Sequence, residues 1–170
     1  MGSSCAGKTT VAAVLAGRLG IPHVELDALH HGPNWQEVTA EELRAKVDAA
    51  LAGRDGWVVD GNYMGKLGRS LIDQADTIVW LDLPLRTLLR RMWLRTAGRV
   101  RDRVELWSPG NFESWRSFLV SWNGLLWYTI RNHYRRRWEW PARFEGGNVV
   151  RLRSPSEVDA WLASQERPPR

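Results

Sequence analysis

The stretch Gly2-Ser3-Ser4-Cys5-Ala6-Gly7-Lys8-Thr9 decides which fold the sequence predicts. It fits the pattern G-x-x-x-x-G-K-[ST], which is typical of loops that wrap around phosphate groups. The glycines allow positive φ, so that successive N–H groups can point at an anion. The Lys8 ammonium can reach the outer phosphates, and the Thr9 hydroxyl can join the shell of a Mg2+ ion. We therefore expect ATP to bind to Gly2, Ser3, Ser4, Cys5, Ala6, Gly7, Lys8, Thr9 and Thr10.

The residues on either side of this loop give one supporting and one conflicting signal. Residues 10–19 are rich in Ala, Val and Leu and predict a helix, whose positive N-terminal end would face the phosphates. A glycine-rich turn that arose by chance would not explain a Lys-Thr pair followed by a helix. A buried strand normally precedes such a loop, yet only Met1 stands before Gly2. We expect that the true chain begins upstream, and that without this first, central strand the fold is marginally stable.

The rest of the chain alternates short apolar segments with helical ones. The segments 21–27, 57–63, 77–84 and 148–152 are typical of buried strands. Helical patterns cover residues 39–51, 67–74, 85–96, 115–138 and 154–162, and Thr39 with Glu42 forms a capping-box pattern. This alternation predicts an α/β fold in which a parallel sheet is flanked by helices.

The composition narrows the class of protein. The 170 residues suit a single domain, 1–170, and no apolar run approaches the roughly 18 residues of a membrane span, so we expect no membrane partner. The single cysteine, Cys5, rules out an internal disulfide or a cysteine-based metal cage, and a cytoplasmic location follows as the default. The formal net charge of +5 leaves an anionic partner such as nucleic acid open.

Two acidic residues lie where strands are expected to end. Asp60 follows two valines, and a carboxylate there could hold Mg2+ together with Thr9, directly or through water. Asp27 could position or deprotonate an acceptor hydroxyl group. The alternative for both residues is a purely structural role, as a cap or turn acid.

Two groups of arginines could contact phosphates. The irregular segment 97–113 predicts a lid, and Arg95, Arg99, Arg101 and Arg103 could place positive charge on a transferring phosphoryl group when the lid closes. A solvated basic face is the alternative. Arg131, Arg135, Arg136 and Arg137 form the second group, which could reach the phosphates or bind nucleic acid, although a solvated helix end is expected for the last two.

Several segments together resemble one known family. Residues 2–9, "ELDALHHGPNW" (25–35), "WVVDGNY" (57–63), "ADTIVWLDLP" (75–84), "ESWR" (113–116) and "VVRLRSPSEVDAWL" (149–162) are similar to the adenylate-kinase-related P-loop proteins labelled DNA topology modulation proteins. The resemblance covers nearly the whole chain. It implies a three-layer P-loop NTPase fold like that of nucleoside monophosphate kinases and shikimate kinase, with five parallel strands.

The resemblance also implies roles for particular residues. It assigns the loop to ATP and Mg2+, and residues 95–103 to the lid. It places Arg153 and Pro155 near the adenine. The walls of the acceptor pocket, within an acceptor region of about residues 27–63, would be Asp27, Asp60, Gly61, Asn62 and Tyr63. That region contains only Arg44 and Arg54 as arginines, so we expect a small hydroxyl compound rather than a nucleotide as the acceptor.

Three functions therefore remain open. The first is a kinase that transfers the γ-phosphoryl group of Mg-ATP to a small acceptor, with Lys8, Asp27, Asp60, Arg95, Arg99 and Arg103 as its catalytic candidates. The second is a nucleic-acid-binding protein that affects DNA topology and uses ATP only as a switch or not at all. The third is an NTPase that acts with a protein partner. A monomer or a homodimer is expected in each case.

Overall fold

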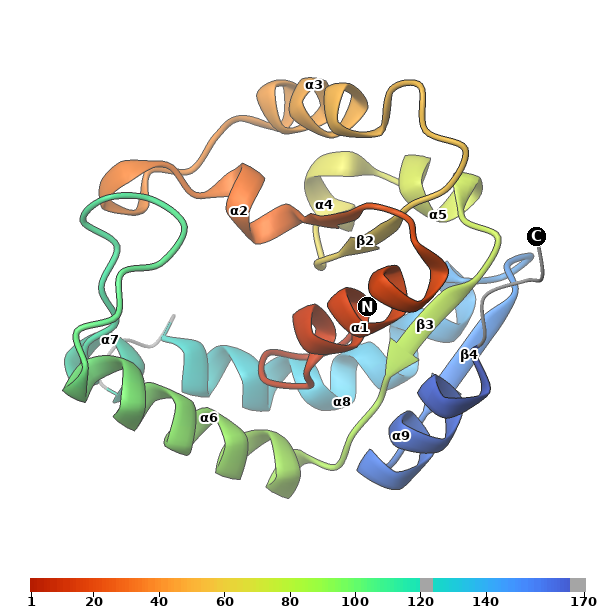
Figure 1. The fold of residues 1–170 in the computed structure, drawn as a ribbon. Coiled ribbons are helices and arrows are strands. Elements are labelled where there is room, and N and C mark those ends of the chain that lie inside the picture. The colour runs from red at the N-terminus through yellow and green to blue at the C-terminus, as the bar shows by residue number, and fades with distance from the viewer. Residues whose placement is uncertain (120–123, 166–170) are drawn as a thin grey trace.

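The structure is a computed structural model, and it describes residues 1–119 and 124–165. Figure 1 shows the elements in chain order. They are α1 (Lys8–Leu19), β1 (His23–Glu25), α2 (Leu26–His30), a 3-10 turn (Pro33–Trp35), α3 (Ala40–Leu51), β2 (Val58–Asp60), α4 (Met64–Leu67), α5 (Ser70–Gln74), β3 (Ile78–Leu81), α6 (Leu85–Arg101), α7 (Trp115–Leu119), α8 (Leu125–Arg143), β4 (Val149–Leu152) and α9 (Pro155–Ser164).

Within the described residues, four strands form two separate parallel pairs. β1 pairs with β2, with His23 opposite Val58, and β3 pairs with β4, with Ile78 opposite Val149. Parallel strands need long crossover connections, and helices supply them here. The predicted α/β class and the parallel pairing are therefore confirmed, although the strands do not join into one continuous sheet.

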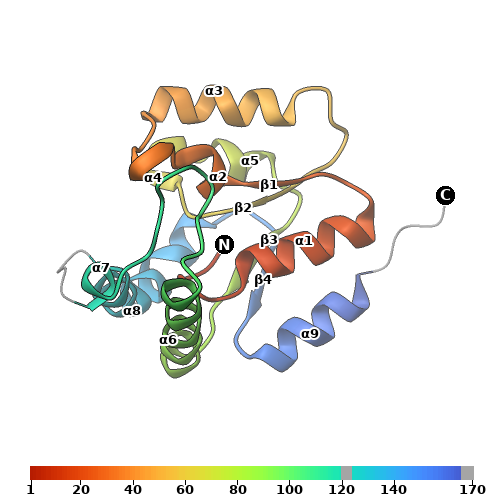
Figure 2. The same cartoon turned by 60° about the vertical axis from the view of Figure 1, so that its left-hand side comes forward.

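The start of the chain lies between these two pairs (Figure 2). The Met1 nitrogen donates to the Val79 carbonyl at 2.9 Å, and the Leu81 amide donates to the Met1 carbonyl at 3.0 Å. Gly2 forms a parallel bridge with Leu81. On the β2 side, the Asn62 side chain accepts from the Gly2 amide at 3.2 Å and donates to the Gly2 carbonyl at 2.5 Å. Met1 and Gly2 thus act as a two-residue piece of strand between β2 and β3.

The two sides of β3 pack against different helices, because successive side chains of a strand point to opposite faces. Leu81 contributes to a cluster with residues of α1, α6, β4 and α9, including Val11 and Leu152. Ile78 and Trp80 face the other way and pack with residues of α5 and α8. Helices therefore cover both faces of the β3–β4 pair, as the alternating sequence pattern predicts.

A third cluster holds the β1–β2 pair to its covering helices. It is centred on Leu26, Leu43, Val47 and Leu67, which belong to α2, α3 and α4. α3 begins with the predicted capping box: the Glu42 amide donates to the Thr39 hydroxyl, and the Thr39 amide donates to the Glu42 carboxylate. In Figure 1, α3 lies on the outside of this part of the molecule.

Several predicted boundaries are wrong. The strand expected over 21–27 ends at Glu25, and a short helix begins at once. The helix expected over 67–74 is divided into α4 and α5, because Gly68 has a φ of 65° that a helix cannot continue through. The long helix expected over 115–138 is also not continuous: Gly124 is extended, with ψ of 157°, and α8 begins only after it and runs to Arg143.

Candidate functional site

The segment of residues 2–9 has the backbone shape of an anion-binding loop. Cys5 and Gly7 have φ angles of 61° and 94°, so the chain reverses tightly before α1. Gly7 is the N-cap residue of α1, and no side chain closes the first turn of that helix. The amides of the first helical turn are thus left for an external acceptor, at the end where the helix dipole favours negative charge. The loop fits the phosphate groups that its sequence pattern predicts.

Lys8 lies at the centre of the site, between the loop and two carboxylates. Its Nζ donates to the Ser3 carbonyl at 3.3 Å, so the side chain folds back across the loop. Burial lowers the pKa of the Lys8 ammonium, while the nearby Asp27 and Asp60 raise it. A buried ammonium with so little water around it is attracted strongly to any anion that enters.

Thr9 and Asp60 form the pair of oxygens that a magnesium site needs. The Thr9 hydroxyl donates to the Asp60 carboxylate at 3.3 Å, and the His23 imidazole lies 2.8 Å from the other oxygen of that carboxylate. Asp60 is only 2% exposed. Mg2+ prefers hard oxygen ligands and usually combines one or two carboxylates with phosphate oxygens and water. Among the described residues, no group of three or more His, Cys, Asp or Glu side chains is placed to hold a metal ion.

Two arginines outside the expected lid also contact the loop. The Arg136 guanidinium is buried, lies 3.4 Å from the Ser3 hydroxyl and donates to the Tyr128 hydroxyl at 2.9 Å. The Arg91 guanidinium donates to the Ala6 carbonyl at 3.1 Å. The expectation of a solvated helix end at Arg136 and Arg137 is wrong. Arg137 instead pairs at 2.6 Å with the carboxylate of Asp82.

A sequence signal for Arg136 did exist. The buried face of α8 consists of Thr129, His133, Arg136 and Trp140, which recur at the spacing of three to four residues that marks one side of a helix. Arg136 also packs against the Tyr128 and Trp140 rings, at 5.4 and 5.3 Å from their centroids. An arginine on the apolar stripe of a helix is therefore the pattern that would have identified this residue.

The residues expected around the acceptor separate into two groups. Asp27 lies in the first turn of α2 rather than at a strand end, and its carboxylate accepts from the Tyr63 hydroxyl at 2.7 Å. Burial raises the pKa of that phenol, and the adjacent carboxylate raises it further. Gly61 and Asn62 serve the fold instead: the first passes close to Leu26, and the second holds Gly2. The structure thus brings Asp27, Asp60 and Tyr63 together near Lys8 and gives the other two a positioning role.

The lid segment is partly helical, and Glu113 ties its far end back to α6. α6 continues to Arg101, so the expected irregular segment 97–113 begins inside a helix. The Glu113 carboxylate lies 2.6 Å from Arg99 and 3.7 Å from Arg95. Arg103 has a φ of 47° in the loop that follows. Two of the four predicted lid arginines are therefore held by an acid of the lid itself.

The tip of the lid rests on the loop after α2. The Pro109 carbonyl accepts from the Asn34 amide at 3.0 Å, and the Ser108 hydroxyl donates to the His31 carbonyl at 2.9 Å. The Trp107 ring stacks on the His31 ring at 5.3 Å between centroids. Segments about 75 residues apart in the sequence therefore meet here. Trp107 also donates to the Glu25 carboxylate at 3.1 Å.

The remaining predicted residues lie further from Lys8 or differ from expectation. Arg153 and Pro155 connect β4 to α9, where the Arg153 amide donates to the Glu157 carboxylate and Pro155 begins the helix. Burial raises the pKa of the Cys5 thiol, which disfavours the reactive thiolate form. His30 is 2% exposed and packs against the Tyr63 ring.

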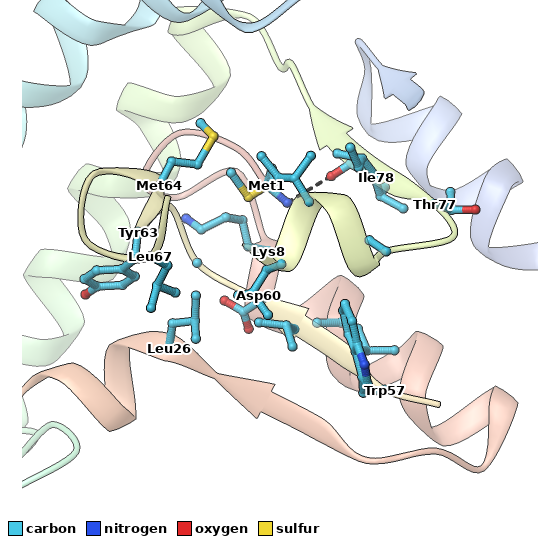
Figure 3. A pocket seen from close by; sticks show the side chains of 18 of the residues that line it. Met1, Lys8, Leu26, Trp57, Asp60, Tyr63, Met64, Leu67, Thr77 and Ile78 are labelled. Atoms are coloured by element: carbon cyan, nitrogen blue, oxygen red, sulfur yellow. Dashed lines mark hydrogen bonds between the residues drawn. The ribbon is translucent and has the colours of Figure 1, made fainter. Parts of the chain in front are cut away.

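A cavity of about 160 Å3 opens beside the phosphate loop (Figure 3). Trp57, Val58 and Val59 border it from the β2 side, and Thr77, Ile78 and Val79 border it from the β3 side. Lys8 and Asp60 stand at one end, near Met1. We call this space the inter-strand slot. Its long walls are the facing edges of two strands and their apolar side chains. A binding site for a phosphoryl acceptor is expected to be polar, so this cavity is a poor match for one.

The comparisons with known proteins add no relative. The chain matches neither a model of a known protein family nor a curated protein. Among the helices in the part of the chain that the structure describes, none is both long and apolar enough to cross a membrane.

Proposed function

We propose that this chain is a P-loop phosphotransferase of the nucleoside monophosphate kinase type, which transfers the γ-phosphoryl group of Mg-ATP to a small acceptor. The observation that carries the proposal is the meeting of four features at one place. These are an uncapped helix N-terminus behind a loop with positive φ angles, the buried Lys8 ammonium, the Thr9–Asp60 oxygen pair and the buried Arg136 guanidinium. Phosphoryl transfer depends mainly on positioning and on stabilising charge, and these groups supply both.

Each residue has a defined part in the proposed reaction. The loop amides and Lys8 bind the phosphates, while Arg136 adds a second positive charge on the side of Ser3. Mg2+ would be held by Thr9 and Asp60 and would neutralise charge on the phosphate oxygens. Asp27, with Tyr63 bound to one of its oxygens, would orient the acceptor hydroxyl.

The charges on the acceptor side support an acceptor without a phosphate group. Glu25, Asp27 and Asp60 interact electrostatically with one another there, and burial raises the pKa of the Glu25 carboxyl. Arg54, one of the two arginines of residues 27–63, instead donates to the Ala50 carbonyl at the far end of α3. A doubly charged phosphate monoester would be repelled by such carboxylates, whereas a neutral or cationic hydroxyl compound would not.

The test is ADP release from Mg-ATP in the presence of hydroxyl compounds and, separately, of nucleoside monophosphates. We expect turnover that requires one acceptor and falls by at least about a hundredfold in Lys8→Ala, because the ammonium stabilises the transferring group. Lys46→Ala is the matched control, since that lysine donates to the Leu29 carbonyl on the surface. Turnover without any acceptor would instead indicate an NTPase, and turnover with AMP would refute the acceptor class.

A second candidate function, nucleic-acid binding, rests on the outer face of α8. Tyr134 and Trp138 are 64% and 84% exposed, and they alternate with the exposed Arg131 and Arg135 along one side of the helix. Aromatic rings beside arginines are typical of surfaces that bind single-stranded nucleic acid. Binding of an oligonucleotide that weakens steeply with salt and is lost in Trp138→Ala would favour this function. Binding that is unchanged in Trp138→Ala would exclude this face.

A further inference from the structure

Three arginines form a row along α6, and the row begins at the phosphate loop. Arg91, Arg95 and Arg99 are spaced four residues apart, so they lie on the same side of the helix. The Arg91 guanidinium donates to the Ala6 carbonyl at 3.1 Å, which fixes that end of the row against the loop. Burial raises the pKa of the Cys5 thiol, and the charges of Arg95 and Arg99 work in the opposite direction, so both guanidinium groups lie near the loop.

A carboxylate of the lid contacts two arginines of this row. The Glu113 Oε1 atom lies 2.6 Å from a nitrogen of Arg99 and 3.7 Å from a nitrogen of Arg95. The other oxygen, Oε2, accepts from the Thr96 hydroxyl at 3.2 Å. Thr96 is fully buried and the Glu113 side chain is 16% exposed, so the carboxylate has little contact with water. An acidic side chain therefore neutralises part of the positive charge that a phosphate group would meet.

This carboxylate leaves part of the hydrogen-bonding capacity of the arginines unused. It accepts from one nitrogen of Arg99, while its distance from Arg95 is too long for a hydrogen bond. The Nε atom of Arg95 is buried and has no hydrogen-bond partner within residues 1–119 and 124–165. A buried donor without an acceptor costs free energy, and a guanidinium carries five N–H groups. Arg95 therefore has donors left for an anion with more oxygen atoms than a carboxylate has.

A phosphoryl group and the Glu113 carboxylate exclude each other beside these arginines. The two guanidinium groups and the carboxylate together carry one net positive charge, whereas a terminal phosphate carries roughly two negative charges. Like charges a few ångströms apart repel strongly where water is scarce, so a phosphate cannot bind well while the carboxylate stays. Once the carboxylate has moved away, Arg95 and Arg99 balance the charge of the phosphate.

We propose that Glu113 is a stand-in for the terminal phosphoryl group of ATP, and that ATP displaces it in order to bind Arg95 and Arg99. ADP lacks that group and leaves the Glu113 contacts in place. The exchange reaches the base of the lid, because α7 begins two residues after Glu113 and its Trp115 ring packs on the Trp93 ring of α6 at 5.0 Å between centroids. Since the displacing group belongs to the nucleotide of the proposed reaction, this role of Glu113 rests on the proposed function.

The test measures, by calorimetry, the affinity for ADP and for the β,γ-imido analogue of ATP, both with Mg2+. Glu113→Gln keeps the size of the side chain and its ability to accept a hydrogen bond, but removes the charge. We expect it to raise the affinity for the analogue about fivefold or more and to change the affinity for ADP by less than about twofold. Glu105→Gln is the matched control, because Glu105 is an exposed acid of the lid that accepts from the Gly110 amide, and it should change neither affinity.

A second variant ties the effect to the arginines. In a chain that carries Arg99→Gln, adding Glu113→Gln should raise the affinity for the analogue by less than about twofold, because the competing ion pair is already lost. A gain of the same size with and without Arg99 would overturn the proposal.

The remaining outcomes separate this inference from the proposed function. Weaker binding of the analogue in Glu113→Gln would overturn the inference, because Glu113 would then orient the arginines for ATP rather than compete with it. Equal changes for the analogue and ADP would overturn it as well. If the unchanged chain binds both nucleotides, such a result leaves the proposed function standing. If the unchanged chain binds neither nucleotide, the proposed function and this inference fail together.

Discussion

The 170-residue chain with a free Met1 amine should become more stable as the pH rises from 5 to 8. In the folded chain this nitrogen is buried, donates to the Val79 carbonyl at 2.9 Å and has a pKa of about 5. Burial is the main cause, the Lys8 ammonium lowers the pKa further, and the Asp60 carboxylate opposes both. In the unfolded chain the amine has its ordinary pKa of 8.0.

The sign and size follow from proton linkage. Between pH 5 and 8 the unfolded chain binds a proton at this amine and the folded chain does not, so the free energy of unfolding increases with pH. One pKa unit corresponds to about 1.4 kcal/mol, so the fall of this pKa from 8.0 to about 5 corresponds to about 4 kcal/mol between pH 5 and 8. Below pH 5 both states are protonated and the full penalty remains, while above pH 8 it is absent.

The assay is urea unfolding at pH 5, 6, 7 and 8 for two forms of the chain. One has a free Met1 amine, verified by intact mass, and the other has an acetylated Met1 that cannot titrate. The burial that lowers the pKa values of His30 and His133 also makes stability rise with pH, but these residues are common to both forms and cancel in the difference. A difference in unfolding free energy that stays constant within about 1 kcal/mol from pH 5 to 8 would refute the reasoning.

Two substitutions test other parts of the site. Gly61→Ala should lower the free energy of unfolding by about 2–4 kcal/mol in urea, because its Cβ would lie 2.7 Å from the Leu26 Cβ and φ is 141°. Gly65→Ala, where no atom lies within 4 Å, is the control and should cost nothing. Arg136→Lys should weaken ATP binding in calorimetry by about tenfold or more, because the planar guanidinium at the loop is lost. The exposed Arg135→Lys is the control and should leave ATP binding unchanged. Equal effects of the two substitutions would exclude a role for Arg136.

Local patterns in the sequence predicted the elements that depend on local interactions. The helix after the phosphate loop, the capping box of Thr39 and the Ser154 cap of α9 are all present, because each is formed by residues within four positions of one another. The parallel pairing was also predictable, since helices separate the strands. The observed α1 begins at Lys8, two residues before the expected start.

The errors arose where distant parts of the chain decide the structure. The apolar pattern before Asp27 continues that of β1, and only the packing of Leu26 against α3 and α4 shows that a helix begins there. The role of Asn62 could not be predicted either, because an amide side chain directly after a strand can bind a ligand as readily as it binds the backbone of Gly2. Arg136 was assigned to the solvent because its neighbours are arginines, although its place on the buried stripe of α8 indicated otherwise.

Side chains from several distant parts of the chain hold the phosphate loop in place. The Asn62 side chain fixes both backbone groups of Gly2, and Arg91 holds the Ala6 carbonyl further along the loop. Lys8 and Arg136 bind Ser3 from within the site. These contacts come from four separate parts of the chain. The shape of the loop is therefore set by side chains that are distant from it in the sequence, and the pattern of residues 2–9 alone does not identify them.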